Sequence, residues 1–125
     1  MNITVYLGAL EGNDPALGDA VRELGTWIGE SGNSLVYGGS KSDAFIAFPG
    51  GTGTLEEIAE VMSMVSLKHL NAPCILYNLN GYYDSLKQLL DHMIKMGLST
   101  SRRQEGIYFV DNLEDIKVLL ATVTK

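Results

Sequence analysis

The sequence has little of several features that mark particular classes of protein. Its 125 residues include one cysteine, Cys74, and three prolines. One cysteine cannot form an intramolecular disulfide, and its place in the apolar run 73–79 predicts a buried structural thiol. No apolar run approaches the roughly 20 residues that a transmembrane helix needs. These absences exclude a scaffold stapled by disulfides and predict a chain without a membrane partner.

Basic residues are also few, since nine Lys and Arg stand against 15 Asp and Glu, for a formal net charge of −6. A duplex or RNA binder needs a basic face, so we expect no nucleic-acid polymer as partner. A single nucleotide is still compatible, because helix N-termini and loop amides can hold one phosphate without Lys or Arg. Met1 and Asn2 lead directly into an apolar strand with no basic stretch, which favours a cytoplasmic protein.

What the chain does contain is a regular alternation of short apolar runs with amphipathic helical patterns. Asp14 is expected to cap the first helix, Ser31-Gly32 to end it, and Asp111 to cap the last one. This alternation predicts an α/β fold, a Rossmann-like doubly wound parallel sheet in three layers that forms a single domain over 1–125. We expect strands at 3–8, 34–39, 43–48, 73–79 and 106–110, and helices at 15–30, 54–67, within 80–97 and at 112–122.

Two glycine-rich turns follow neighbouring strands, one at Gly38-Gly39 and one at 50–53. In parallel sheets, ligands bind beyond the carboxyl ends of the strands, so both turns are candidates for a binding site. Only four residues separate Gly38 from Asp43, whereas a parallel connection needs roughly a dozen or more. Taken literally, residues 34–48 should form a hairpin that puts the two turns at opposite edges. Either the sheet is mixed, or a segment is missing from the sequence at this point.

Two motifs carry a specific resemblance. Residues 49–57, "PGGTGTLEE", fit the signature P-G-G-x-G-T-x-x-E, and 78–84 fit N-x-x-G-Y-Y-D. The chain resembles, over nearly all of its length, the Lonely-guy (LOG) family of cytokinin riboside 5′-monophosphate phosphoribohydrolases, whose older label is possible lysine decarboxylase. Family members carry additional helices, a strand and an M-x-x-R-K motif before the strand that precedes P-G-G. None of these is present, so we expect a segment of about 50 residues to be missing near 40–42.

The resemblance implies an activity and a set of site residues. The activity is hydrolysis of the N-glycosidic bond of a nucleoside 5′-monophosphate to free base and ribose 5-phosphate, with no cofactor, no metal and a homodimeric enzyme. Glu57 matches the catalytic glutamate of the family, whereas no residue matches its catalytic arginine. Lys41, Lys68, Arg102 and Arg103 remain candidates for a phosphate contact. The residues that match the phosphate and ribose site are Gly39, Gly50, Gly51, Thr52, Gly53, Thr54 and Glu56.

Each of these residues also has a structural interpretation. The glycines of 50–53 let amides approach an anion at a helix N-terminus, but they would equally suit a plain strand-to-helix turn. Thr54 and Glu57 are three apart and could form a capping box. Three functions therefore stay open: a hydrolase, a nucleotide sensor that does not hydrolyse, and a parallel-sheet domain with a purely structural motif. Met62 and Met64, on different faces of the second helix, favour a dimer through that helix.

Overall fold

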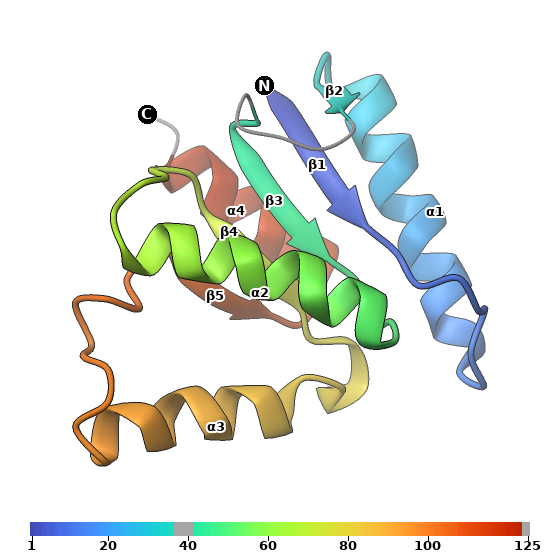
Figure 1. Cartoon of the computed structure of the whole chain (residues 1–125). Coiled ribbons are helices and arrows are strands. Elements are labelled where there is room, and N and C mark those ends of the chain that lie inside the picture. Colours follow the sequence, from blue (N-terminus) through green and yellow to red (C-terminus); the bar gives the residue numbers. More distant parts are fainter. Residues whose placement is uncertain (37–41, 124–125) are drawn as a thin grey trace.

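The computed structural model describes residues 1–36 and 42–123, which form a five-stranded sheet between two layers of helices (Figure 1). The strands are β1 (Asn2–Tyr6), β2 (Ser34–Val36), β3 (Ala44–Ala47), β4 (Cys74–Tyr77) and β5 (Ile107–Val110). The helices are α1 (Pro15–Glu30), α2 (Thr52–Ser66), the 3-10 turn η1 (Leu79–Gly81), α3 (Asp84–Lys95) and α4 (Leu113–Val123). The predicted three-layer α/β fold is confirmed.

The strand order is β2-β1-β3-β4-β5, and every pairing in the described part of the sheet is parallel. β1 lies between β2 and β3, so that Ile3 is level with Leu35 on one side and with Ala44 on the other. The hairpin over 34–48 and the mixed sheet are therefore both wrong, because β2 and β3 are not neighbours. Seven residues, 37–43, connect Val36 to Ala44, which is shorter than parallel connections usually are.

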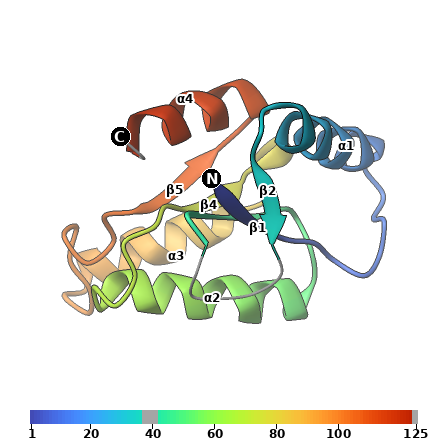
Figure 2. The same ribbon diagram turned by 90° about the horizontal axis from the view of Figure 1, so that it is seen from above.

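The two central strands hold the core. All four residues of β3 and all four of β4 are buried. Side chains alternate along β3: Ile46 packs into a cluster with α1 and α4, and Phe45 packs into a cluster with α2 and α3. Figure 2 shows these helix pairs on opposite faces of the sheet. Burying one such side chain contributes about 1.5–3 kcal/mol, so the loops that follow β3 and β4 start from the most firmly packed part of the molecule.

Helix α1 begins and ends where its sequence predicts. The Asp14 carboxylate accepts a hydrogen bond from the Ala16 amide at 2.9 Å, as expected of an N-cap. Gly32 has a φ of +77° directly after the C-cap Ser31, and this left-handed conformation favours glycine. No helix in the described residues is long and apolar enough to cross a membrane.

The start of α4 differs from expectation, and the start of α3 lies within its predicted range. Asn112, not Asp111, caps α4, because its side-chain oxygen accepts a hydrogen bond from the Asp115 amide at 2.9 Å. Helix α3 begins only at Asp84, since Asn80 upstream has a φ of +51° that interrupts the helix. This start lies within the predicted range 80–97, and Leu79–Gly81 before it form the 3-10 turn η1.

Candidate functional site

The glycine loop, residues 50–53, runs from the carboxyl end of β3 into the first turn of α2. Gly51 is the N-cap and offers no side chain to the free amides of the helix. The first backbone hydrogen bond of the turn joins the Leu55 amide to the Gly51 carbonyl at 3.1 Å. The amides of Thr52, Gly53 and Thr54 come before this bond and therefore have no partner within the helix, as at any helix start. Unpaired amides and the helix dipole together favour an anion at this position.

The loop begins in close contact with the end of β1. A Cβ added to Gly50 would lie 2.8 Å from Thr54 Cβ and 3.2 Å from Gly8 Cα. A Cβ added to Gly8 would lie 3.0 Å from Gly50 Cα. Two backbones therefore touch where only glycine fits. Gly8 was missed by the sequence analysis, although a glycine immediately after the first strand is a signal that could have indicated it.

A cavity of about 580 Å³ lies between the glycine loop and the loop that follows β1. Of the predicted site residues, Gly50, Gly51, Thr52, Gly53, Thr54 and Glu57 all line it. Glu56 is exposed on the same helix but is not one of the lining residues. Gly39 lies outside the described residues. The other residues that line this cavity, which we call the glycine-loop cavity, are Leu7, Gly8, Ala9, Leu10, Gly12, Leu17, Pro49 and Tyr82.

Glu57 is exposed in the second turn of α2, where it faces the end of β1. Its negative charge, after the larger effect of burial, raises the pKa of Tyr6, the last residue of that strand. The predicted capping box is wrong, because the helix begins at Thr52 and Thr54 is already its third residue. Within the described chain, the Glu57 carboxylate has no hydrogen bond or ion pair, so it is available to a ligand.

The N-x-x-G-Y-Y-D motif braces the glycine loop, a role that the sequence analysis did not assign. The Tyr82 hydroxyl donates a hydrogen bond to the Gly50 carbonyl, and the Tyr83 hydroxyl donates one of 2.7 Å to the Phe48 carbonyl. Asn78 fixes the turn by accepting a hydrogen bond from the Tyr83 amide at 2.6 Å. Burial raises the pKa of Tyr83, which keeps its hydroxyl protonated and able to donate.

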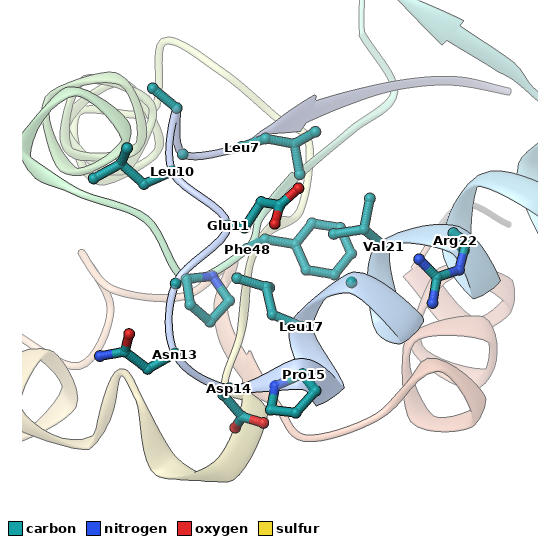
Figure 3. A pocket seen from close by; sticks show the side chains of 15 residues that line it. Leu7, Leu10, Glu11, Asn13, Asp14, Pro15, Leu17, Val21, Arg22 and Phe48 are labelled. Atoms are coloured by element: carbon teal, nitrogen blue, oxygen red, sulfur yellow. The ribbon is translucent and has the colours of Figure 1, made fainter.

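A second cavity of about 590 Å³ adjoins the first and lies under the loop that follows β1 (Figure 3). The Phe48 ring lies beside Leu17 and Val21 there, so much of its wall is apolar. Asp14 holds this loop from the other side, since its carboxylate accepts a hydrogen bond of 2.6 Å from the Asn80 side chain. The two cavities share Leu7, Gly8, Ala9, Leu10, Gly12, Leu17 and Pro49.

Most of the predicted phosphate-binding cations lie at the wrong edge of the sheet. Lys68 follows the C-terminus of α2, and its ammonium donates a hydrogen bond of 2.8 Å to the Arg102 carbonyl. Arg102 and Arg103 precede β5, so all three lie at the amino-terminal edge of the strands, opposite the glycine loop. These three candidates are therefore not placed to contact a phosphate at the glycine loop. Lys41 lies outside the described residues, and no Lys or Arg of the described chain lines the glycine-loop cavity.

A doubly wound parallel sheet with a glycine-rich helix N-terminus at its carboxyl edge defines a Rossmann-like protein with a site suited to a phosphate. The family model described as "Possible lysine decarboxylase" matches residues 39–120. The chain belongs to this family. The match confirms the resemblance to the LOG proteins that the P-G-G-x-G-T-x-x-E signature indicated.

Curated relatives agree with this family but match only part of their own length. "Cytokinin riboside 5'-monophosphate phosphoribohydrolase LOG4" of Arabidopsis thaliana is 48% identical over 64 residues, which are 50% of this chain and 30% of the relative. The corresponding LOG2 protein of the same plant is 38% identical over 82 residues, 66% of this chain and 38% of the relative. The "Cytokinin riboside 5'-monophosphate phosphoribohydrolase" of Rhodococcoides fascians is 39% identical over 72 residues, which are 58% of this chain and 36% of the relative. The matched part of the chain spans about a third of these relatives.

Proposed function

We propose that this protein hydrolyses the N-glycosidic bond of a nucleoside 5′-monophosphate to free base and ribose 5-phosphate. One observation carries the proposal: the amides at the start of α2 and the carboxylate of Glu57 line the same cavity. The names of the relatives point to cytokinin riboside 5′-monophosphates as substrates. AMP is the second candidate, because such ribotides share its ribose 5-phosphate.

The spacing along α2 supports these roles. Glu57 lies three positions after Thr54, a rise of about 4.5 Å along the axis, so a phosphate held at the amides leaves the sugar beside the carboxylate. As the base leaves with the bonding electrons, positive charge develops at C1′ of the ribose. The Glu57 carboxylate would stabilise that charge or take a proton from the water that attacks C1′. Glu56 is proposed to contact ribose hydroxyls, and Gly39 the phosphate.

No Lys or Arg of the described residues lines the glycine-loop cavity to balance the negative charges of a phosphate and of Glu57. This agrees with our proposal that the natural protein carries about 50 further residues near 40–42, including the arginine that completes the site. Two features support it. The outer edge of β2 has no partner strand in the described sheet, and Leu35 on β2 is 49% exposed. The Arabidopsis LOG4 alignment, 64 residues for 30% of the relative, gives that protein roughly 210 residues.

Intact-protein mass spectrometry of the protein purified from its natural source tests the missing segment. The sequence above corresponds to 13.6 kDa. We expect a mass larger by about 5 to 6 kDa, at roughly 110 Da for each of some 50 residues. A measured mass of 13.6 kDa would show that the sequence is whole and would remove the proposal.

We also propose a homodimer that pairs through α2. Met62 is 8% exposed and belongs to the core of its own domain, so it no longer supports the argument. Leu55 in the first turn of α2 is 44% exposed, and Leu67, its C-cap, is 58% exposed. These two side chains are apolar surface that a partner copy would cover. Light scattering after size exclusion tests the dimer, and a monomer at micromolar concentration would contradict it.

Release of free base is the direct test of the proposed activity. Purified protein is incubated with AMP or with N6-isopentenyl-AMP, and the free base is measured by chromatography. We expect base release from at least one of them, and much slower release from adenosine, which lacks the phosphate.

The absence of a cation from the described cavity lining also favours a second candidate, a nucleotide sensor that binds without hydrolysis. Saturable binding of AMP with no base release would support the sensor. Lysine decarboxylation is disfavoured, because no lysine of the described chain lines the cavity to form a Schiff base.

A further inference from the structure

We propose that Tyr82 is a positioning residue of the glycine loop. Its hydroxyl fixes the peptide between Gly50 and Gly51 so that the Gly51 amide faces the cavity and can donate to a phosphate. This inference rests on the proposed function for the nature of the ligand. It adds a residue that lies outside the P-G-G-x-G-T-x-x-E signature, about 30 positions further along the chain.

The orientation follows from peptide geometry. The Tyr82 hydroxyl donates a hydrogen bond to the Gly50 carbonyl. In a trans peptide the carbonyl and the following N–H point in opposite directions, so the Gly51 N–H points away from the Tyr82 hydroxyl. On that far side lies Gly8: a Cβ added to it would sit 3.6 Å from the Gly51 nitrogen. Gly8, Gly50 and Gly51 all line the glycine-loop cavity, so this amide lies at the wall of that cavity.

The two tyrosines of the motif have different environments and different roles. Tyr83 is 6% exposed and is part of the core cluster under α2 and α3. Tyr82 is 54% exposed, and its ring meets that of Tyr83 edge-on at 5.0 Å between centroids. Tyr82 therefore contributes little buried area, and its main specific contact is the bond to the loop.

The loop needs such a restraint. A Cβ added to Gly51 would meet no atom within 4 Å. Gly53 already belongs to α2, so Gly51 is the residue whose conformation the hydrogen bond to the Gly50 carbonyl restrains. Glycine also has more conformational freedom than any other residue. A hydrogen bond to the preceding carbonyl removes part of that freedom before the ligand arrives, which is the usual benefit of preorganisation.

The experiment compares wild-type protein, Tyr82→Phe and Tyr108→Phe by calorimetric titration with ribose 5-phosphate. Tyr108 on β5 lies away from the site and serves as the matched control for removal of one phenol hydroxyl. We expect Tyr82→Phe to bind ribose 5-phosphate roughly five- to tenfold more weakly, the usual effect of one lost hydrogen bond. The KM for AMP should rise by the same factor while kcat is kept, because the phosphate is held equally in ground and transition states. The melting temperatures should match.

Four outcomes decide the inference. Wild-type affinity of Tyr82→Phe for ribose 5-phosphate would overturn it, and so would an equal loss of affinity for adenosine, which has no phosphate. Failure of the wild-type protein to bind ribose 5-phosphate would overturn it as well. Tight, Tyr82-dependent binding without any base release would support the positioning role and end the proposed hydrolysis, so the two proposals fail separately.

Discussion

The two halves of the glycine loop use the same residue for different reasons. At its start, Gly50 is enclosed by Thr54 and by the backbone of Gly8, and Tyr82 holds its carbonyl. Further on, Gly51 and Gly53 have open space where a side chain would be. The first half, Gly50, needs glycine so that two loops can pack, and we call it the enclosed half. The second half, Gly51 to Gly53, leaves space for a ligand at a helix N-terminus, and we call it the open half. A run of glycines thus combines a structural requirement with a binding surface, and substitutions should separate the two.

The largest effect of a substitution is expected at Glu57, which follows the open half of the loop, and it concerns kcat. Replacing Glu57 by Gln keeps the size of the side chain and removes the charge beside the proposed ribose position. We expect kcat for base release from AMP to fall by on the order of 10²-fold, with affinity for ribose 5-phosphate kept. Steady-state kinetics and calorimetry measure the two quantities. Glu60→Gln, one turn further along α2 and outside the cavity lining, is the control. Unchanged kcat in a folded Glu57→Gln would end the catalytic role.

The next largest effect is a loss of unfolding free energy when a residue of the enclosed half is substituted. Gly50→Ala places a methyl group against Thr54 and the Gly8 backbone, and overpacking of this kind costs about 1–3 kcal/mol of unfolding free energy. Urea denaturation measures that cost. Gly51→Ala, at the next position, adds a methyl group with no neighbour within 4 Å and serves as control. If both variants unfold at the same urea concentration, the packing argument is wrong.

A smaller effect on affinity should appear in the open half. Gly53→Val meets no protein atom near its Cβ but narrows the space in front of the amides, so affinity for ribose 5-phosphate should fall about tenfold, or about 1.4 kcal/mol. Gly25→Val makes the same change at an open position of α1, away from the site. Both positions lie in a helix, so the change from Gly to Val should alter helix propensity similarly in the two variants. Equal affinities of the two variants would show that the glycine loop does not hold the phosphate.

The smallest effect concerns the loop that follows β1, where Asp14 lines the adjoining cavity and accepts a hydrogen bond from Asn80. The hydrogen bond from Asn80, followed by that from the Ala16 amide, lowers the pKa of Asp14 from its usual value. A carboxylate with a lowered folded-state pKa adds stability above its unfolded pKa, about 3.9, and loses it as the pH falls through the folded value. Wild-type protein should therefore melt higher than Asp14→Asn at pH 5–7. This gap should close below about pH 4, and a gap that widens in acid would contradict the assignment.

Local features of the fold were predictable from the sequence because short-range chemistry decides them. The Asp14 cap, the Gly32 end of α1 and the position of the glycine loop after a buried strand all follow from residue types and spacing. The order of the strands did not follow, because placing β1 between β2 and β3 depends on packing between segments far apart in the chain. For the same reason a local pattern could not show that Lys68 and Arg102 lie at the far edge.

The sequence predicted which residues form the candidate site better than it predicted the contacts that hold them in place. Glu57 and residues 50–54 were expected together, and they line one cavity. The roles of Gly8 and Tyr82 were not predicted, because both residues reach the loop from distant positions in the chain and a motif does not show which loop it will contact. The capping box failed because the helix starts at Thr52, where Gly51 lets the backbone enter the turn without a side-chain cap.

Among the described residues β2 is an edge strand, and this has a consequence for handling the protein in solution. An edge strand presents unpaired backbone donors and acceptors that can template the strand of another molecule. β2 has only three residues, Ser34–Val36, and its Leu35 side chain is half-exposed. A chain of this length should therefore associate slowly at high concentration by adding strands at β2. Such association would grow with time and protein concentration, and it would leave the cavity at the other side of β1 accessible.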